Sequence, residues 1–445
     1  MGKYSIEFTI YNSAKVLLSF KSSALKLLSI FGLLLLLYCW SAGFKSLLDS
    51  FAAPVVYWKD CNQFYLMGKA ITHGVDPYTS LATLAGWWLP AWHPYPYPAP
   101  YPPFVGLMCV PLAGVNFVLM AWVWLVAELV CLFALLAIVW RWVGGRIFSL
   151  LFWLVFLLLV VCPPINGELR GGQVMTFFAL LLVCTWKELR ADKNMTGGLL
   201  LGFILACKII VWPVALLLIF YRRWVALVTC CSVFVLTNAI SVLWLGLPTV
   251  VRYYTHVGAV NAELWRGYQD NMSTWGWGAR LCSGIGWGYH LLPAIPWPAA
   301  VPFVSYLAPL ALLVYFGLLI RKTKNFDTFF GLMLFASVLL SPILWNFYVL
   351  LLLLPLVMLG QRYFLAGVSL EYWLGPVMLL VVLVLPFSLW VSFAQSFGFG
   401  PGQTISFFAG LFTIAPALAM LLLSWLFWRS ERLIMGPSEL PLRLT

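Results

Sequence analysis

Two isolated carboxylates are the first candidates for chemistry in a sequence that is otherwise mostly apolar. Asp60 and Asp76 lie in a segment rich in prolines and aromatic residues, residues 44–102, which follows a long apolar run. Apolar surroundings raise the pKa of a carboxyl group and make it a better general base. We therefore interpret Asp60 as the catalytic base and the nearby Tyr65 as a substrate contact. A helix N-cap or a solvated loop carboxylate is the alternative for Asp60.

Asp76 has a different expected role, because it directly precedes a proline. An Asp–Pro pair commonly begins a turn, so we interpret Asp76, Pro77 and Tyr78 as a structural loop. The sequence has no Asp-x-Asp pair and no cluster of His with Asp, so we expect no metal site. It also lacks the glycine-rich motifs that bind nucleotides, and we expect no cofactor.

A second polar stretch, residues 270–284, offers groups that suit a sugar phosphate. Asn271 and Ser273 can form hydrogen bonds, and Arg280 is a permanent cation suited to phosphate. The sequence therefore predicts substrate contacts at Asn271 and Ser273 and a donor phosphate contact at Arg280. The alternative is a helix capped near Ser273, with Arg280 at the membrane interface.

Two further polar positions lie between these stretches. Lys208 stands within the apolar run at residues 197–221, where a cation is costly unless it is paired or reaches an anion such as a lipid phosphate. We interpret it as a second phosphate contact, with snorkelling or a buried partner as alternatives. Gln173, a candidate substrate contact, follows Glu168 and Arg170, for which a structural Glu–Arg pair is an alternative.

Residues 341–348 are one more candidate segment and lie near the end of a later apolar run. Ser341 is expected to cap a helix there. Trp345, Asn346 and Tyr348 are expected near the interface, and Trp345 and Asn346 are expected to contact substrate.

The composition indicates which elements position these residues. Of 445 residues, 63% are hydrophobic and only 9% are charged, whereas a soluble domain carries about 25% charged residues. Apolar runs of near-spanning length recur, without the alternation of a β-barrel. We predict an all-α polytopic membrane protein, a single domain over residues 1–445 with about 10–12 transmembrane helices.

The expected spans can be placed along the sequence, and one apolar segment is ambiguous. Residues 197–221 are long enough to cross, but Lys208 and Pro213 interrupt them, so we predict a broken, re-entrant helix. The predicted spans are 25–43, 115–140, 147–165, 171–187, 225–246, 298–320, 326–341, 343–360, 372–392 and 403–428.

Lys and Arg predict the orientation, because they concentrate on the cytoplasmic side. If residues 197–221 re-enter, most of the 26 basic residues fall in inner loops and at the two termini. This also explains the net charge of +12 without nucleic acid. The long segments 44–102 and 247–297 then form two outer loops, joined by short outer turns such as residues 163–170. We expect both termini to be cytoplasmic and the chemistry to be extracytoplasmic, in a bacterial inner or plasma membrane.

The order of these motifs resembles a known family. Asp60, the Gly-Val-Asp-Pro-Tyr turn, Tyr-Pro-Pro, the Lys-bearing broken helix, Asn-x-Ser with Arg280, and Ser-Pro-x-x-Trp follow one another over residues 55–350. This order is similar to that of polyprenyl-phosphate-mannose-dependent mannosyltransferases, GT-C type membrane enzymes that include those extending phosphatidylinositol mannosides. Two positions depart from the pattern. Lys208 is followed by Ile209 instead of proline, and Asn346 stands where histidine is common.

The resemblance implies a lipid-linked sugar donor, an extracytoplasmic site, and a catalytic Asp that matches Asp60. A phosphate leaving group needs no protonation, so one carboxylate suffices where a glycosidase needs two. We therefore expect transfer of a hexose, mannose by resemblance, from a polyprenyl phosphate to a lipid or envelope glycan, with inversion. The alternative is a transporter or flippase of an amphiphile, because broken helices line transport sites; however, only one such segment is found in the sequence.

Overall fold

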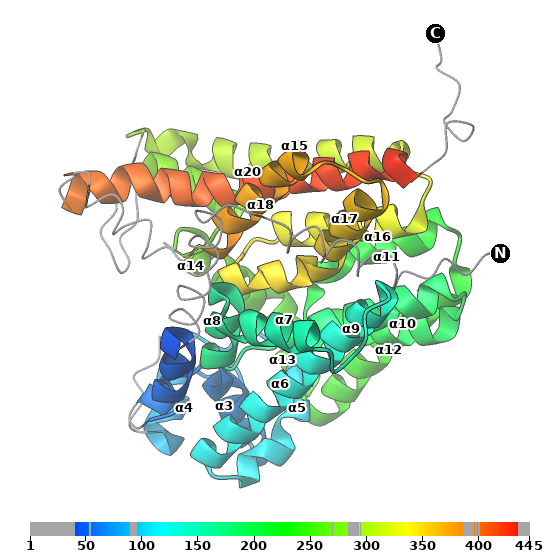
Figure 1. Ribbon diagram of the computed structural model, residues 1–445. Coiled ribbons are helices and arrows are strands. Elements are labelled where there is room, and N and C mark those ends of the chain that lie inside the picture. The colour runs from blue at the N-terminus through cyan, green and yellow to red at the C-terminus, as the bar shows by residue number, and fades with distance from the viewer. Residues whose placement is uncertain are drawn as a thin grey trace.

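The structure is a computed structural model, and it contains only helices and their connections in the part that it describes (Figure 1). This confirms the predicted all-α fold of a polytopic membrane protein. The predicted span 25–43 lies almost entirely outside the described residues. Both termini, which we expected to be cytoplasmic, also lie outside them. The described residues are 41–52, 55–89, 96–268, 270–283, 295–385 and 401–434, with single positions at 293, 396 and 398.

Four described segments are long and apolar enough to cross a membrane, and each coincides with a predicted span. Their exposed residues are largely apolar, as Val235 and Leu243 illustrate with exposed fractions of 64% and 86%. Such surfaces suit a lipid environment. The four segments are α6 (Phe117–Trp142), α12 (Trp224–Leu245), Pro298–Arg321, which includes α15 (Val301–Arg321), and Asn346–Leu365, which joins η8 (Asn346–Leu352) to α17 (Leu353–Leu365).

A bent pair of helices would make a fifth crossing. The helices α7 (Leu150–Val161) and α8 (Pro163–Gly171) meet at 65°. Pro163 and Pro164 explain the bend, because proline lacks a backbone N–H and is tolerated only in the first turn of a helix. Residues 163–170, which we predicted to be a short outer turn, form the helix α8; their position outside the membrane stays a prediction.

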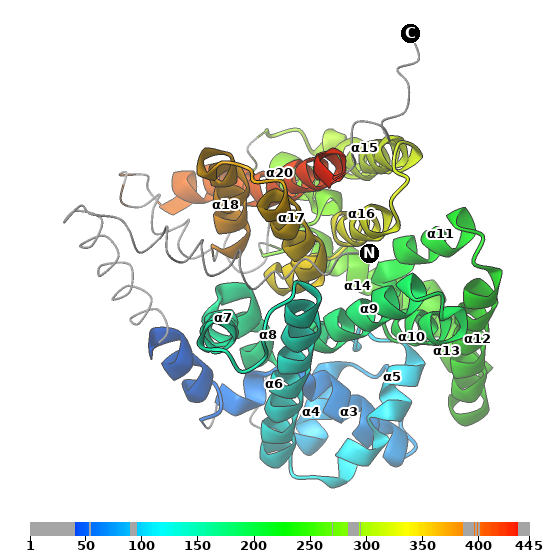
Figure 2. The same cartoon turned by 45° about the vertical axis from the view of Figure 1, so that its right-hand side comes forward.

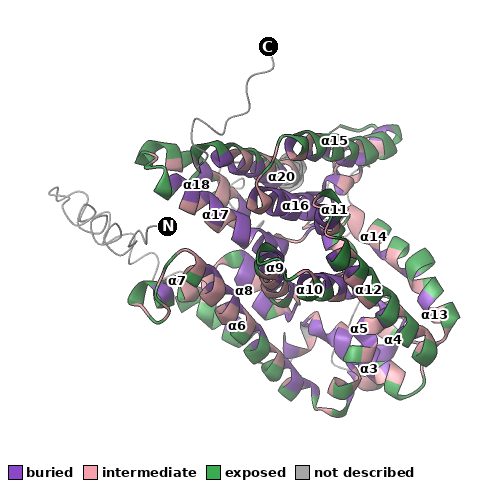
Figure 3. Cartoon of the chain, turned by 90° about the vertical axis from the view of Figure 1, so that its right-hand side faces the viewer, coloured by how far each residue is buried: buried purple, intermediate pink, exposed green. Residues whose placement is uncertain are grey.

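The predicted span 326–341 and the predicted re-entrant segment correspond to shorter apolar helices, whereas the predicted span 403–428 falls within the 34-residue helix α20 (Pro401–Ile434). Both α10 (Asn194–Cys207) and α16 (Phe326–Leu339) have 14 residues. At about 1.5 Å per residue this is roughly 21 Å, less than the ~30 Å of a bilayer core. Figure 3 shows α16 at the centre of the molecule, with every residue from Thr328 to Leu339 buried. The number of crossings stays a prediction.

Small residues set the close packing of α10 on α12. A Cβ added at Gly198 would overlap the backbone of Ala226, and one added at Gly202 would overlap the backbone of Cys230. Gly198 and Gly202 are four residues apart on α10, as Ala226 and Cys230 are on α12. Each helix therefore presents small residues on one face, as in close membrane helix pairs. The two helices run side by side in Figures 1 and 2. This contact fixes α10, at whose C-terminal end Lys208 lies.

The two long segments predicted as outer loops contact each other. Asp76 forms an ion pair with Arg252 (2.7 Å), and Asn261 Nδ2 donates to the carbonyl of Pro98 (3.3 Å). Neither segment is simply a loop. The first contains α3 (Cys61–Thr72) and α4 (Leu81–Trp88), with α5 (Pro103–Met108) just beyond its end, and the second contains α13 (Leu247–Arg252) and α14 (Gly258–Arg266).

Several predicted inner loops also meet one another. Arg190, at the end of α9 (Met175–Arg190), forms an ion pair with Asp327 (3.4 Å). Arg223, after α11 (Trp212–Phe220), donates to the side chain of Asn194 (3.1 Å). The broken segment between Asn194 and Arg223 therefore returns to the place where it began, which is the geometry predicted for a re-entrant segment.

Candidate active site

Asp60 directs its side chain into the protein and does not cap the helix that follows it. It occupies the N-cap position of α3, but its carboxylate makes no capping hydrogen bond. Its backbone N–H donates to the carbonyl of Gly171 (2.7 Å), and its Oδ2 accepts a hydrogen bond from Nε2 of Gln173. Burial raises the pKa of the Asp60 carboxyl above its ordinary value, while the hydrogen bond from Gln173 and the charge of Lys208 oppose that rise.

Glycine at 172 allows the end of α8 to lie against the start of α3, next to Asp60. Gly172 has φ +66°, a left-handed conformation that favours glycine. A Cβ at this position would lie 2.9 Å from Sγ of Cys61, which is too close. The missing side chain thus lets the α8–α9 connection approach the start of α3, and Gln173 lies at that connection.

Lys208 lies at the break between α10 and the 3-10 turn η3 (Ile209–Val211). Its backbone is extended (φ −158°, ψ 111°), so the helix ends there. The Nζ atom lies 4.6 Å from the ring centre of Tyr348 and 5.4 Å from that of Tyr101, within cation–π range. The two carboxylates that attract Lys208 are those of Glu168 and Asp60. The structure therefore brings Lys208, Asp60 and Gln173 into one cluster.

Tyr101 completes this cluster and was not among the predicted site residues. Its hydroxyl donates to Oε1 of Gln173 (3.2 Å), so the amide of Gln173 connects Tyr101 to Asp60. Its carbonyl accepts a hydrogen bond from the hydroxyl of Tyr78 (2.9 Å). The Tyr-Pro-Pro motif was the available signal, but a motif does not indicate which way a ring faces. Tyr348, on η8, was missed for the same reason.

Glu168 is a helix cap and not the partner of Arg170. Its Oε1 accepts hydrogen bonds from the backbone N–H groups of Met175 and Thr176, at the start of α9. Its Oε2 is buried and has no hydrogen-bond partner among the described residues. No Glu168–Arg170 ion pair is found there either. Glu168 thus places a second carboxyl group close to Lys208 and Asp60.

Asn271, Ser273 and Arg280 form a second cluster, in which they hold one another and the segment 341–344. Asn271 Oδ1 accepts from the backbone N–H of Leu344 (2.8 Å), and Ser273 Oγ donates to the carbonyl of Ser341 (2.6 Å). The Arg280 guanidinium, only 2% exposed, donates to the carbonyls of Asn271, Ser273 (2.9 Å) and Gly276 (3.3 Å). Their polar groups are thus engaged with the chain itself.

Trp345 and Asn346 connect the two clusters. The Trp345 ring packs edge-on against Trp265 (5.7 Å between centroids), while Asn346 begins η8 beside Gly167 of α8. Because η8 carries Tyr348, the segment braced by Arg280 determines where Tyr348 meets Lys208.

The other predicted residues lie around the first cluster. Asp76 Oδ1 accepts from the backbone N–H of Tyr78 (2.8 Å), which is the geometry of an Asp–Pro turn through Pro77. Tyr65 packs edge-on against Phe117 of α6 (5.4 Å between ring centroids), and Nζ of Lys69 lies 5.5 Å from the centre of its ring. No group of three or more metal-ligating side chains occurs among the described residues.

Comparison with known proteins places the chain among glycosyltransferases. Residues 100–342, more than half of the chain, match glycosyltransferase family 87. A polyprenol-phosphate-mannose-dependent alpha-(1-2)-phosphatidylinositol pentamannoside mannosyltransferase of Mycolicibacterium smegmatis is 25% identical over 183 residues. That alignment covers 39% of this chain and 44% of the relative, less than half of its length. No solved structure matches. On the family match, the chain belongs to glycosyltransferase family 87.

Proposed function

We propose that this glycosyltransferase transfers a hexose, mannose in the first instance, from a polyprenyl-phosphate sugar to a hydroxyl of a lipid or envelope glycan. This donor class, a polyprenyl-phosphate sugar, is the one in the name of the Mycolicibacterium relative. The observation that supports the proposal most strongly is the cluster of Asp60, Gln173 and Lys208, which places one oriented carboxylate near one half-buried cation. Family membership favours this reading over the transporter that the broken segment also suggested.

In the proposed reaction Asp60 is the general base. The acceptor oxygen attacks the anomeric carbon as the bond from that carbon to the phosphate oxygen breaks, and the acceptor proton moves to Asp60. Attack opposite the leaving group inverts the anomeric centre. The products are the glycosylated acceptor and a polyprenyl phosphate monoester. A carboxylate with a raised pKa suits proton abstraction near neutral pH.

Lys208 is proposed to stabilise the departing phosphate. A phosphate is a weakly basic leaving group, so a nearby positive charge is more useful than a proton donor. The aromatic rings of Tyr101 and Tyr348 flank the ammonium, and the carboxyl groups of Asp60 and Glu168 lie close to it. In an inverting displacement, the base acts on the attacking acceptor hydroxyl and the cation on the departing phosphate. Asp60 and Lys208 are proposed for these two roles.

Arg280 has a more indirect place in this proposal. Three of its five N–H groups are used by backbone carbonyls, so its first role is to brace the segment that carries Tyr348. Direct phosphate binding by Arg280 stays a prediction, as do substrate contacts by Asn271, Ser273, Tyr65, Trp345 and Asn346. The extracytoplasmic location of the site also remains part of the proposal.

The test is transfer by the purified full chain in mixed micelles, with radiolabelled polyprenyl-phosphate mannose and a membrane lipid extract. We expect a labelled, glycosylated product with the wild type and none with Asp60→Asn. Asp49→Asn is the matched control, because Asp49 is an exposed carboxylate before the site. Polyprenyl-phosphate glucose and a nucleotide-linked mannose in parallel reactions test the sugar and the carrier. Product from the nucleotide sugar alone would overturn the proposed donor.

A further inference from the structure

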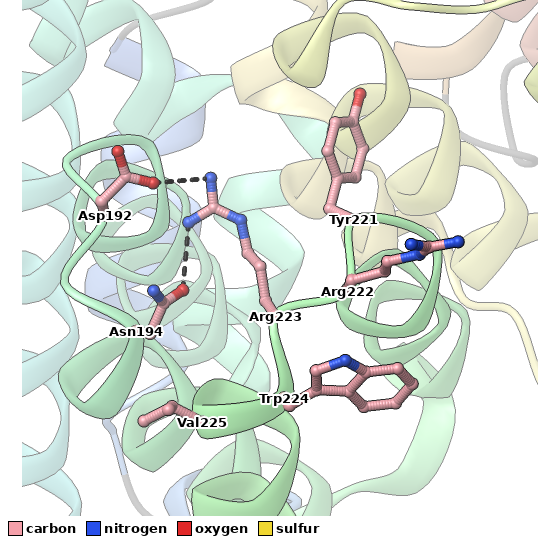
Figure 4. Close-up of a pocket in the computed structure, with 7 residues that line it drawn as sticks. All are labelled: Asp192, Asn194, Tyr221, Arg222, Arg223, Trp224 and Val225. Carbon is pink, nitrogen blue, oxygen red and sulfur yellow. Dashed lines mark hydrogen bonds and ion pairs between the residues drawn. The ribbon is translucent and has the colours of Figure 1, made fainter.

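A cavity of about 380 Å³ lies far from the Asp60 cluster, where the α9–α10 turn meets the α11–α12 turn (Figure 4). Asn194, which begins α10, lines it, whereas Lys208 follows the other end of the same helix. Fourteen residues of helix separate the two places by roughly 21 Å. The cavity is therefore distinct from the proposed transfer site.

Arg223 forms a fixed wall of this cavity. Its guanidinium pairs with Asp192 (3.1 Å) and donates to Asn194 Oδ1 (3.1 Å) and to the carbonyl of Leu189. These bonds tie two turns together, as the dashed lines in Figure 4 show. The charge of Arg223 is thus largely balanced by Asp192, and its role in the cavity is to hold the shape.

Arg222 provides the positive charge that is not balanced. Its side chain is exposed and makes no ion pair or hydrogen bond within the described part of the chain. Figure 4 shows its guanidinium extending between the side chains of Tyr221 and Trp224, on the side opposite to Asp192. Two arginines and one aspartate leave the lining with a net positive charge, so an anion is the ligand that it favours.

The surroundings of Arg222 indicate that this anion is the headgroup of a lipid. Phe220, Trp224 and Val225 are exposed by 63%, 56% and 60%, although all three are strongly apolar. Trp224 begins α12, a candidate membrane span. Exposed Trp and Arg at the end of a span are typical of the boundary between headgroups and acyl chains. A free phosphate ion would gain nothing from such an apolar rim.

We propose that this cavity binds the phosphate of an acidic phospholipid, with Arg222 as its cation and Phe220, Trp224 and Val225 beside the acyl chains. The site is independent of sugar transfer. Basic pockets beside transmembrane helices bind acidic lipid headgroups by the same chemistry.

The test is thermal unfolding of the full chain, purified in a neutral detergent and titrated with phosphatidylglycerol, phosphatidylcholine or inorganic phosphate. We expect a saturable rise in Tm with phosphatidylglycerol and none with the other two. Arg222→Gln should weaken the apparent affinity for phosphatidylglycerol about fivefold, since one basic residue near a membrane surface contributes about 1 kcal/mol. Arg222→Lys should retain it.

Controls distinguish the site from a general charge effect. Arg321→Gln is the matched variant, because Arg321 is exposed at the end of α15, in another predicted inner loop, and does not line the cavity. It should bind phosphatidylglycerol like the wild type. Trp224→Ala gives a second readout and should also weaken binding. Equal shifts with phosphatidylcholine, or full affinity in both Arg222→Gln and Trp224→Ala, would overturn the proposal. A shift with inorganic phosphate alone would assign the cavity to a free ion.

Discussion

Gln173 donates a hydrogen bond from Nε2 to Oδ2 of Asp60 and accepts one at Oε1 from the hydroxyl of Tyr101. The two bonds fix both ends of the amide, and the amide in turn fixes the direction of the carboxylate. Gln173 is therefore a positioning residue for the proposed base, and its loss should be visible in the pH dependence as well as in the rate.

Replacing Gln173 with alanine should lower kcat about tenfold or more, as loss of outer supporting hydrogen bonds commonly does. The hydrogen bond from Gln173 lowers the pKa of Asp60, so its removal should raise that pKa. The acid limb of the kcat/KM profile should then move to higher pH. Gln361→Ala, outside the cluster, should leave the profile in place. An unchanged acid limb with Gln173→Ala would contradict the positioning role.

Burial of Asp60 should also affect stability. Because its pKa is raised in the folded protein, its contribution to stability is fully present at pH values below the unfolded pKa and is lost as pH rises through the folded pKa. Near neutral pH, Asp60→Asn should therefore have a Tm equal to or above that of the wild type, and the difference should shrink as the pH is lowered. Thermal unfolding from pH 4 to pH 8 measures this, and a Tm advantage that grows on acidification would have the wrong sign.

Lys208→Met should lower kcat by about two to three orders of magnitude, a loss typical of removing a group that stabilises developing charge. Lys208→Arg should recover part of the rate, because it restores the charge with a different shape. Lys45→Met is the control, since Lys45 is exposed. If Lys208→Met changes only KM for the donor and leaves kcat intact, the residue binds the donor without acting on the transition state.

Arg280→Ala should destabilise the protein, because three backbone carbonyls lose a charged donor. We expect a cost of about 3 kcal/mol or more in the free energy of unfolding, seen as a lower Tm. Arg321→Ala should cost little. A variant that keeps its Tm but has a raised KM for the lipid-linked sugar would instead support direct phosphate binding by Arg280.

Because α10 and α12 approach closely, we expect substitutions of Gly202, which lies away from Asp60, to lower stability and activity. A Cβ at Gly202 would overlap the backbone of Cys230, so Gly202→Ala should separate the helices and displace Lys208. Both Tm and kcat should fall. Gly86→Ala on α4 is the control, because a Cβ there meets open space and alanine favours helix. Equal behaviour of the two variants would contradict this packing.

Local patterns were sufficient to predict several parts of this molecule. The helical fold follows from apolar runs, the turn at Asp76 from the proline after it, and the break at Lys208 from a cation inside an apolar segment. Asp60 was interpreted as a general base because apolar surroundings raise the pKa of a carboxyl group, and this role stays a prediction. Each inference used residues that are neighbours in the chain.

The remaining features depend on contacts between distant segments. Tyr101 and Tyr348 flank Lys208 from positions far from it in sequence, and aromatic residues make up 17% of the chain, so no pattern distinguished these two. A structural pair of Glu168 with Arg170 was one of the expected alternatives, whereas Glu168 caps α9. Arg280 was expected at the donor phosphate, and the carbonyls that engage it become visible only once the 271–276 segment is folded.

The most direct measurement is a single-turnover experiment with Asp60→Asn and excess enzyme, in which donor binding and product formation are followed together. We predict that the variant binds polyprenyl-phosphate mannose with an affinity close to that of the wild type, and that the transfer rate falls by about two to four orders of magnitude, the range of general-base catalysis. A transfer rate within a few-fold of the wild type, in a variant that is folded and binds donor, would contradict the assignment of Asp60 as the base.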